Sequence, residues 1–202
     1  MRSKLRIFAA ADMHGNPRIS ERLAEKADSY KADIVVIAGD ITNFDTISKG
    51  MIAPFVEKGR EVLFVPGNHD SFATAEILEH RYKIHNLHGH SLVKQGIGFF
   101  GCGGGNVILN QLSENEVLDY LEKGFRYIAK AEKKVMVTHI HPAGSVIEKA
   151  SFAGSKAVAK AIKKFKPDIH ICSHIHEMEG IEEKIGRTRV ICVGQAGKII
   201  EV

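Results

Sequence analysis

The stretch Val62-Leu63-Phe64-Val65-Pro66-Gly67-Asn68-His69-Asp70 decides the fold that we expect for this chain. Its first four residues are apolar and are closed by Pro66-Gly67, which is typical of a short buried strand that ends in a tight turn. Asn68 offers a neutral oxygen to a cation, His69 can carry a proton near neutral pH, and Asp70 can orient the imidazole. This combination is typical of a metal-assisted hydrolase, although a polar turn that caps the next helix would use the same residues.

Two earlier segments also place polar residues directly after an apolar strand. The strand expected at 7–11 is followed by Asp12 and His14, and the strand expected at 33–38 is followed by Asp40. If the backbone stays extended, Asp12 and His14 project to the same side and suit one metal ion. A capping turn is the alternative for this pair. Three successive strands are therefore expected to end in groups that bind metals.

Helices are expected between these strands. Asn16 followed by Pro17 is a typical helix start, whereas Gly50 and Pro54 weaken the second helix. The predicted helices cover about 17–29, 45–58 and 72–82. Strands and helices that alternate with short connections predict a parallel sheet covered by helices, whose ligands bind beyond the carboxyl ends of the strands.

The second half again alternates strands and helices, after a segment of short apolar runs that are interrupted by glycine. Short runs broken by glycine predict hairpin strands between 84 and 102, and a capping box at 113–116 opens a helix to about 133. The glycine-rich segment 101–106 lacks the Lys-Ser/Thr ending of a phosphate-binding loop and is expected to be a flexible turn. Further expected elements are strands at 135–137 and 169–172, a helix over about 156–165, and antiparallel strands over 180–202 that complete a second sheet.

Histidines dominate the polar groups of the second half. His139 follows one predicted strand, and His174 and His176 follow the next. The segment 143–155 contains Gly and Ser and is expected to form a loop over the site, while His141 just before it has no assigned role. The other histidines are interpreted more simply: His170 as an ordinary strand residue, and His85, His88 and His90 as exposed loop residues rather than a second metal cluster.

Length and composition favour one soluble domain over 1–202. The chain is 44% hydrophobic and 26% charged, and no linker-like stretch divides it. No apolar run approaches the roughly 20 residues that span a bilayer, and the basic N-terminus leads straight into a strand, so we expect a cytoplasmic protein with no membrane partner. The three cysteines are expected to be buried free thiols. The net charge of +4 is scattered, which disfavours a nucleic-acid partner without excluding it.

Taken together, the polar groups at the strand ends indicate a metal site more strongly than any one of them does alone. Two divalent metal ions that share a ligand would account for their number, and imidazoles with carboxylates favour Mn, Fe, Zn, Ni or Co over Mg or Ca. None of these strand ends presents a cysteine. The groups at the strand ends are Asp12/His14, Asp40, Asn68/His69, His139 and His174/His176.

These residues resemble the motifs of the calcineurin-like metallophosphoesterases, in the small single-domain form of prokaryotes and archaea. The resemblance covers about 7–176 in the order of the family's motifs. Ser173 stands where the family commonly has Gly, and 193–197 lacks the Asn-Pro-Gly often found there. The five matching motifs are Asp12-x-His14, Gly39-Asp40-x-x-Asn43, Gly67-Asn68-His69-Asp70, Thr138-His139 and Ser173-His174-x-His176.

The resemblance implies an α/β fold of four layers, in which two mixed β-sheets pack face to face with helices outside. It also implies that Asp40 bridges two metal ions, and that His69, oriented by Asp70, is the catalytic general acid. The implied ligands are Asp12, His14, Asp40 and His176 for one metal, and Asp40, Asn68, His139 and His174 for the other.

Such a site would hydrolyse a small phosphomonoester or phosphodiester. A metal pair lowers the pKa of a bridging water and clamps the phosphoryl oxygens, and protonated His69 then neutralises the leaving oxygen. Two alternatives remain in view. An inert member that serves as a protein-interaction scaffold would show gaps in the ligand set, and a nuclease of the same family would show a longer chain or a basic stripe. Neither feature occurs in the sequence.

Overall fold

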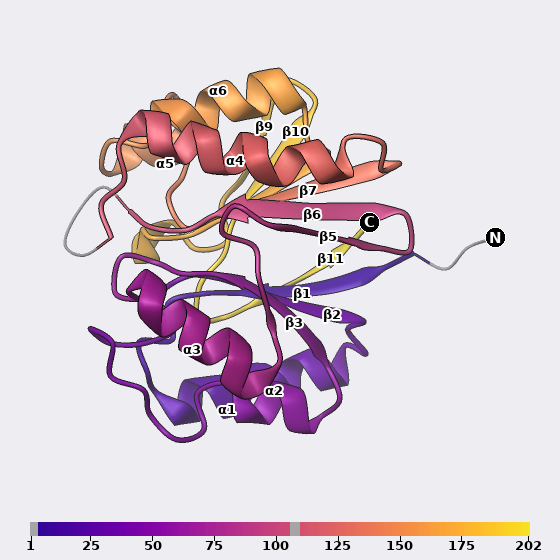
Figure 1. The fold of residues 1–202 in the computed structure, drawn as a ribbon, viewed down its shortest axis with the longest axis vertical. Helices are drawn as coiled ribbons and strands as arrows, with labels where there is room; N and C mark the ends of the chain where they lie inside the picture. The colour runs from indigo at the N-terminus through magenta and orange to yellow at the C-terminus, as the bar shows by residue number, and fades with distance from the viewer. Residues whose placement is uncertain (1–3, 106–109) are drawn as a thin grey trace.

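The computed structural model describes residues 4–105 and 110–202, and these residues form two β-sheets that pack face to face with helices outside (Figure 1). Asn106, the last residue of the predicted glycine-rich turn, lies outside the described residues. In the described ranges, no helix is long and apolar enough to cross a bilayer. The predicted four-layer arrangement of two mixed sheets between helices is confirmed.

The first sheet has five strands in the order β11-β1-β2-β3-β4. The strands β1 to β4 run parallel to their neighbours, whereas β11 pairs antiparallel with β1. The buried strands β1, β2 and β3 therefore all point their carboxyl ends toward one edge. The bounds are Arg6–Ala10 for β1, Ile34–Ala38 for β2, Glu61–Val65 for β3, His85–Asn86 for β4 and Lys198–Glu201 for β11.

The second sheet has six strands in the order β5-β6-β7-β8-β10-β9. Its centre, β6 to β10, is parallel, and the two outer strands β5 and β9 pair antiparallel with β6 and β10. The bounds are Ser91–Lys94 for β5, Ile97–Cys102 for β6, Lys133–Thr138 for β7, Ile169–Cys172 for β8, Glu182–Ile185 for β9 and Thr188–Cys192 for β10.

Helices cover the outer face of each sheet (Figure 1). The Asn16 side chain accepts the N–H of Arg18 at the start of α1, and Ser113 and Glu116 form the predicted capping box of α4. Three helices lie against the first sheet: α1, Pro17–Ser29; α2, Ala53–Glu57; and α3, Phe72–Tyr82. The second sheet carries α4, Glu114–Ile128; α5, Val146–Ala150; and α6, Lys156–Phe165, with a short 3-10 helix at His176–Met178.

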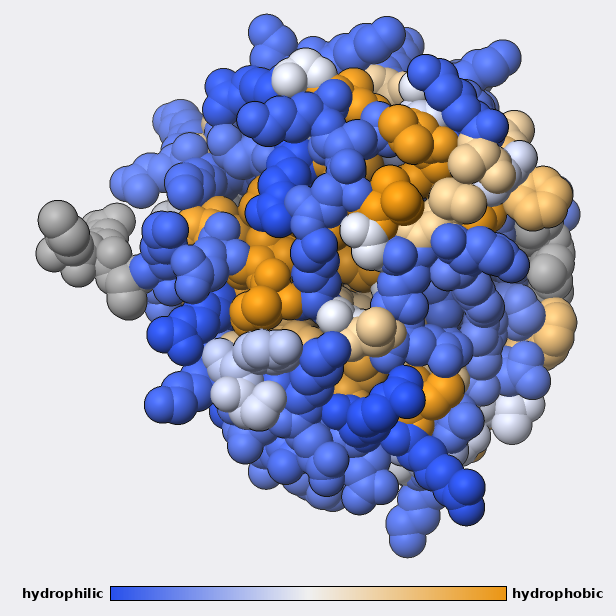
Figure 2. Space-filling model, turned by 180° about the vertical axis from the view of Figure 1, so that it is seen from behind, coloured by the Kyte–Doolittle hydropathy of each residue, from blue (hydrophilic) through white to orange (hydrophobic). Residues whose placement is uncertain are grey.

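The core has a layer between the two sheets and a layer under each set of helices. In β1, Ile7 and Ala9 face the opposite sheet, whereas Phe8 and Ala10 pack under the helices. This alternation follows from the two-residue period of a strand, and both faces of β1 are buried. From behind, hydrophobic side chains show across the middle of the molecule, between hydrophilic ones at the top and bottom (Figure 2). The three cysteines are buried and free, as predicted.

Two segments that we predicted as a turn and a loop are partly regular, since residues 101–102 belong to β6 and the segment 143–155 contains α5. Three further predicted elements differ from the observed ones. The helix expected over 45–58 is reduced to α2, because Gly50 adopts a φ of 88° and the backbone N–H of Ser71 donates to Asp45. The helix expected to reach 133 ends at Ile128, because the chain must enter β7 beside β6. The tail does not stay within one sheet, since β11 returns to pair with β1. In each case a tertiary contact overrides a local preference.

Candidate metal centre

The predicted site residues follow the carboxyl ends of five parallel strands. Asp12 comes after β1, Asp40 after β2, and Asn68 after β3 in the first sheet. His139 comes after β7, and His174 after β8, in the second sheet. Because both sheets direct these strand ends to the same side of the molecule, residues far apart in sequence meet there (Figure 1).

Several of these residues lie in an unusual backbone conformation. The φ angles are 57° for Asp12, 47° for His14, 51° for Asp40 and 78° for His174. These values fall in the left-handed region, which costs an L residue free energy, and such strain concentrates at functional sites. The extended backbone that we expected through 12–14 is therefore wrong. Asp12 and His14 still converge, but through a turn rather than by strand alternation.

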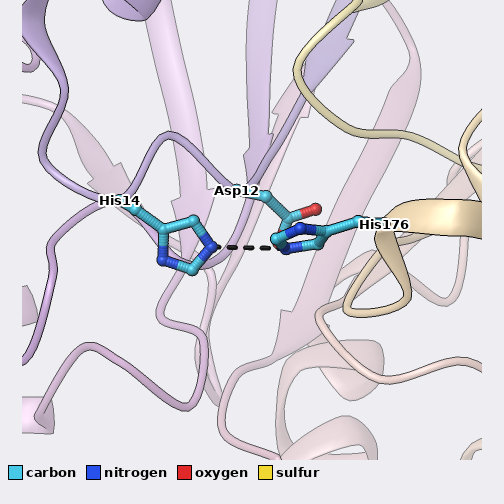
Figure 3. Close-up of side chains that lie close together, drawn as sticks. All are labelled: Asp12, His14 and His176. Carbon is cyan, nitrogen blue, oxygen red and sulfur yellow. Dashed lines mark hydrogen bonds and ion pairs between the residues drawn. The ribbon is translucent and has the colours of Figure 1, made fainter.

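One group of side chains comprises Asp12, His14 and His176. Figure 3 shows the three side chains directed toward one another, with His14 and Asp12 on the loop after β1 and His176 on the segment after β8. The Nε2 atoms of His14 and His176 are 3.3 Å apart, and Nε2 of His176 is 3.8 Å from Oδ1 of Asp12. Their ligand atoms lie close enough together to hold one metal ion.

Asp40 stands at the middle of the remaining groups. Its Oδ2 lies 3.4 Å from Nε2 of His139, 3.9 Å from Nε2 of His14 and 4.0 Å from Nε2 of His69. Within residues 4–105 and 110–202, Asp40 belongs to two of the three clusters able to hold a metal, one with His14 and His69 and the other with Asp12 and His139. The carboxylate of Asp40 is therefore placed where a ligand that bridges two metal ions would lie.

Asn68 and His174 complete the site on the side of His139. Oδ1 of Asn68 is 3.1 Å from Nε2 of His139, and Nδ1 of His174 is 3.2 Å from the same nitrogen. Nδ1 of His139 lies 2.8 Å from the carbonyl oxygen of Ala38 and donates a hydrogen bond to it. That bond leaves Nε2 of His139 to face the cluster, as a metal-ligating histidine requires.

Two glycines allow the strand ends to approach one another. A Cβ on Gly39, whose φ is 96°, would collide with the ring of His139. A Cβ on Gly67 would collide with the carboxylate of Asp40. Since glycine has no Cβ, the loops after β2 and β3 bring Asp40 against both neighbours.

The surroundings of Asp12 fit a cation. Oδ2 of Asp12 accepts a hydrogen bond from the hydroxyl of Ser173, and its backbone carbonyl accepts one of 2.6 Å from Nε2 of Gln195. Its other carboxylate oxygen, Oδ1, is buried and has no hydrogen-bond partner among the described residues. A buried carboxylate oxygen is costly unless it meets a positive charge, and Oδ1 faces His176 within the cluster. The donor set thus fits a metal ion.

Burial and neighbouring charges shift the pKa values of the side chains in the site. Burial raises the pKa of Asp12 to about 6. Burial disfavours the imidazolium of His139, but the neighbouring Asp40 outweighs it and raises the pKa of His139 to about 10. Burial also opposes the charge of Asp40, yet His139 and the backbone N–H of His69 hold its pKa well below the usual range. Burial and the charge of His139 lower the pKa of His174 to about 3. A positive charge is thus favoured beside the two carboxylates.

Asp70 has a different position from the one we predicted. Its carboxylate accepts backbone N–H groups from Gly67, Ile41 and Thr42, at 2.9, 3.0 and 2.6 Å, and also the hydroxyl of Thr42 at 2.7 Å. Nδ1 of His69 is buried without a hydrogen-bond partner in the described part of the chain. The prediction that Asp70 orients the imidazole through a hydrogen bond is therefore wrong. Asp70 instead ties the loop after β3 to the loop after β2.

Sequence reasoning also missed the contacts of four residues, of which Ser173 and Gln195 touch the centre. Ser173 and Gln195 hold Asp12, although the sequence showed only that they depart from the family's usual residues. His88 is not an exposed loop residue, since it is half-buried, with ring centroids 4.4 Å from Phe72 and 4.1 Å from Tyr120. Buried His170, interpreted as an ordinary strand residue, lies 2.7 Å from Oγ1 of Thr138.

The segment 143–155 is hydrogen-bonded to His141, two residues beyond His139. The buried His141 donates from Nε2 to the carbonyl of Phe152 at 3.0 Å, and the backbone N–H of Ser155 bonds to the carbonyl of His141 at 2.9 Å. His141 thus has a structural contact that the sequence did not indicate. Whether the segment covers a substrate stays a prediction.

Comparisons with known proteins agree with this geometry. The model of the calcineurin-like phosphoesterase family matches residues 5–178. The uncharacterized protein MJ1162 of Methanocaldococcus jannaschii is 30% identical over 204 residues, which cover 93% of this chain and 87% of that protein.

Similar solved structures share the fold at low sequence identity. The protein TT1561 of Thermus thermophilus superposes with a TM-score of 0.78 at 16% identity, covering 98% of this chain and 99% of that one. A dimetal phosphatase from Danio rerio superposes with a TM-score of 0.65 at 13% identity, covering 96% and 88%. At these identities the likeness concerns the fold alone.

Proposed function

The chain belongs to the calcineurin-like phosphoesterase family, and from this premise we propose that it hydrolyses phosphate esters at a centre of two divalent metal ions. The observation that carries the proposal is the convergence of imidazole, carboxylate and amide groups around Asp40. The unpartnered, buried Oδ1 of Asp12 supports it, because among the described residues this oxygen faces the cluster.

The chain's own groups divide into two ligand sets. Asp40 belongs to both sets, since its Oδ2 lies within 4.0 Å of side chains on either side. Imidazole-rich sets favour Mn, Fe, Zn, Ni or Co over the oxygen-preferring Mg and Ca. We assign Asp12, His14, Asp40 and His176 to one ion, and Asp40, Asn68, His139 and His174 to the other.

The ions and the protein have separate tasks. When bound, two divalent ions would supply positive charge that polarises a phosphoryl group and acidifies water. His139 is held by Ala38, and Asp12 by Ser173, so the chain keeps these ligands in one orientation. Such preorganisation avoids a rearrangement of the site during the reaction.

We assign His69 the role of general acid. Its Nε2 lies 4.0 Å from Oδ2 of Asp40, so it borders the metal ligands, and its side chain is 16% exposed, so a substrate can reach it. A proton donated to the leaving oxygen would contribute about 100- to 10,000-fold to the rate. Asp70 has no contact with the reacting groups in this assignment, and acts by holding the loops that carry Asp40 and His69.

The substrate class is a small phosphomonoester or phosphodiester. The groups that we assign at the centre are metal ligands and one general acid, so in this proposal phosphate recognition rests mainly on the ions. The proposal places no membrane or nucleic acid at the site.

Metal removal tests the proposal. The protein is stripped with a chelator, its metal content is measured, and hydrolysis of a phosphomonoester and a phosphodiester is followed before and after adding Mn or another transition metal. We expect activity to vanish with the metal and to return with it. Full activity in protein whose metal is shown to be removed would contradict the proposal.

A further inference from the structure

Phe44 is an aromatic residue at the edge of the metal centre with no assigned role. It follows Asn43 in the loop after β2, and 53% of the residue is exposed. Its ring centroid lies 4.4 Å from that of His69, with the two planes inclined by 51°. One part of the ring therefore packs on the proposed general acid, while the rest faces solvent.

The loop holds Phe44 in a costly conformation. The φ angles of Phe44 and Asp45 are 48° and 61°, both in the left-handed region that L residues rarely adopt. Strained backbone that persists because hydrogen bonds hold it clusters at functional sites and ligand clamps, and here it holds a phenyl ring against the proposed general acid. This combination points to a use for the ring at this place.

Hydrogen bonds on both sides of Phe44 attach the loop to the segment that carries His69. The backbone N–H of Thr42 donates to the carboxylate of Asp70 at 2.6 Å, and the N–H of Asp45 donates to the carbonyl of His69 at 3.2 Å. The carboxylate of Asp45 accepts the N–H of Ser71 at 2.6 Å. The position of Phe44 relative to His69 is therefore set in advance of any binding.

The ring of His69 is located by packing. Its Nδ1 has no hydrogen-bond partner among the described residues, so no acceptor there fixes the imidazole from behind. His14 contacts the ring edge-on, with centroids 4.7 Å apart and planes inclined by 79°, and Phe44 packs against it as well. A leaving group that receives a proton from His69 must lie beside this ring, and hence beside Phe44.

We propose that Phe44 is a specificity-determining residue, and that the preferred substrates are phosphate esters whose leaving group carries a flat aromatic ring. The inference rests on the proposed function, because it uses His69 as the group next to the leaving oxygen. The exposed face of Phe44 receives the planar ring, and the metal centre holds the phosphoryl group. A stacked pair of aromatic rings strengthens binding by about 2- to 10-fold relative to contact area alone.

Binding of phosphonates tests the inference without turnover. The affinities of phenylphosphonate, cyclohexylphosphonate and methylphosphonate for the metal-loaded protein are measured by calorimetry. We expect phenylphosphonate to bind more tightly than the non-planar cyclohexyl compound of similar bulk. Equal affinities of these two ligands for the wild-type protein would overturn the inference, whatever the variants do.

Variants locate the preference. Phe44→Leu keeps an apolar side chain but removes the ring, and should reduce the phenyl-over-cyclohexyl ratio about 2- to 10-fold, whereas Phe44→Tyr should preserve it. Tyr127→Leu is the matched control, because Tyr127 is an aromatic residue that is 79% exposed on α4. Its neighbour Ile128 packs against Gly98 near the start of β6. Tyr127 therefore lies away from the carboxyl ends of the strands, where the centre is. An unchanged ratio in Phe44→Leu would overturn the role of Phe44.

Hydrolysis separates this inference from the proposed function. Phenyl and alkyl phosphate esters are compared as kcat and KM in wild type and Phe44→Leu, and we expect the loss to be larger for the phenyl ester. If neither ester is hydrolysed in the presence of metal, the proposed function fails while the phosphonate ratio is still measurable. If both are hydrolysed and Phe44→Leu affects them equally, only the inference about Phe44 fails.

Discussion

The two sheets contribute different chemistry to the same centre. The first sheet supplies all the oxygen ligands that we assign, on the loops after β1, β2 and β3, together with His14 and His69. The second sheet supplies only imidazoles, on the segments after β7 and β8. The oxygen ligands are Asp12, Asp40 and Asn68, and the imidazoles of the second sheet are His139, His174 and His176.

Because of this division, neither half could build the centre alone. In our assignment each ion takes ligands from both sheets, and Asp40 of the first half stands 3.4 Å from His139 of the second. The second half also orients the first, since Ser173 and Gln195 bond to Asp12. Bound metal should therefore link the two sheets and stabilise their packing. Three predictions test this comparison.

The largest effect is expected where the halves share a ligand. Asp40→Ala should lose both ions and reduce activity to background, because one carboxylate serves both ligand sets. Even a residue behind the ligands typically alters metal affinity about 10- to 100-fold, so losing the shared ligand should cost more than about 100-fold. Metal content by elemental analysis and the thermal shift on adding metal measure this effect.

Asp33→Ala is the control for this loss. Asp33 also carries a carboxylate next to β2, but it precedes the strand and accepts the N–H of Arg6 at 2.8 Å, away from the centre. We expect the Asp33 variant to retain both ions. Retention of two ions by Asp40→Ala would contradict the bridging assignment.

The next effect separates catalysis from metal binding within the first half. His69→Ala should keep both ions and lower kcat about 100- to 10,000-fold for an alkyl ester, because the alkoxide leaving group needs a proton. A nitrophenyl ester should be affected much less, since nitrophenolate leaves well without one. Turnover of both esters is measured beside the metal content.

The exposed His80 on α3 supplies the matched control. His80→Ala should leave both rates and the metal content unchanged. Equal losses on the two esters, or loss of metal in His69→Ala, would show that His69 acts electrostatically or structurally and not as a general acid.

The smallest effect per pH unit concerns a histidine of the second half that binds no metal in our assignment. Burial lowers the pKa of His170 to about 3, so this residue is neutral in the folded protein and takes up a proton only on unfolding at mildly acidic pH. Between about pH 6.5 and pH 3 the unfolded state binds more protons, and the free energy of unfolding should fall as the pH falls, by up to about 1.4 kcal/mol per unit.

His170→Gln keeps a donor toward Thr138 and removes the titration. Denaturant unfolding at several pH values should show a shallower loss of stability in this variant than in the wild type. Slopes are compared rather than absolute stabilities, because the altered packing of Gln shifts the free energy of unfolding by the same amount at every pH. Identical slopes would show that His170 does not contribute to the acid sensitivity.

The elements and the chemistry of the centre could be predicted from the residues. Helices with local start signals, such as those at 72–82 and 156–165, lie where the sequence predicts them. The order of an apolar strand followed by a polar group depends on neighbouring residues only, so it could be recognised at Asp12, Asp40 and Asn68 without a structure.

The relations between distant residues emerged only in the folded chain. Folding placed β11 in the first sheet, turned the backbone at Asp12 left-handed, and gave Asp70 the backbone N–H groups of other loops instead of His69. It also set Phe44 against His69. The physical reason is that these hydrogen bonds and ring contacts join segments far apart in the chain. They form only where the whole fold brings those segments together, and the residues next to each segment do not determine that placement.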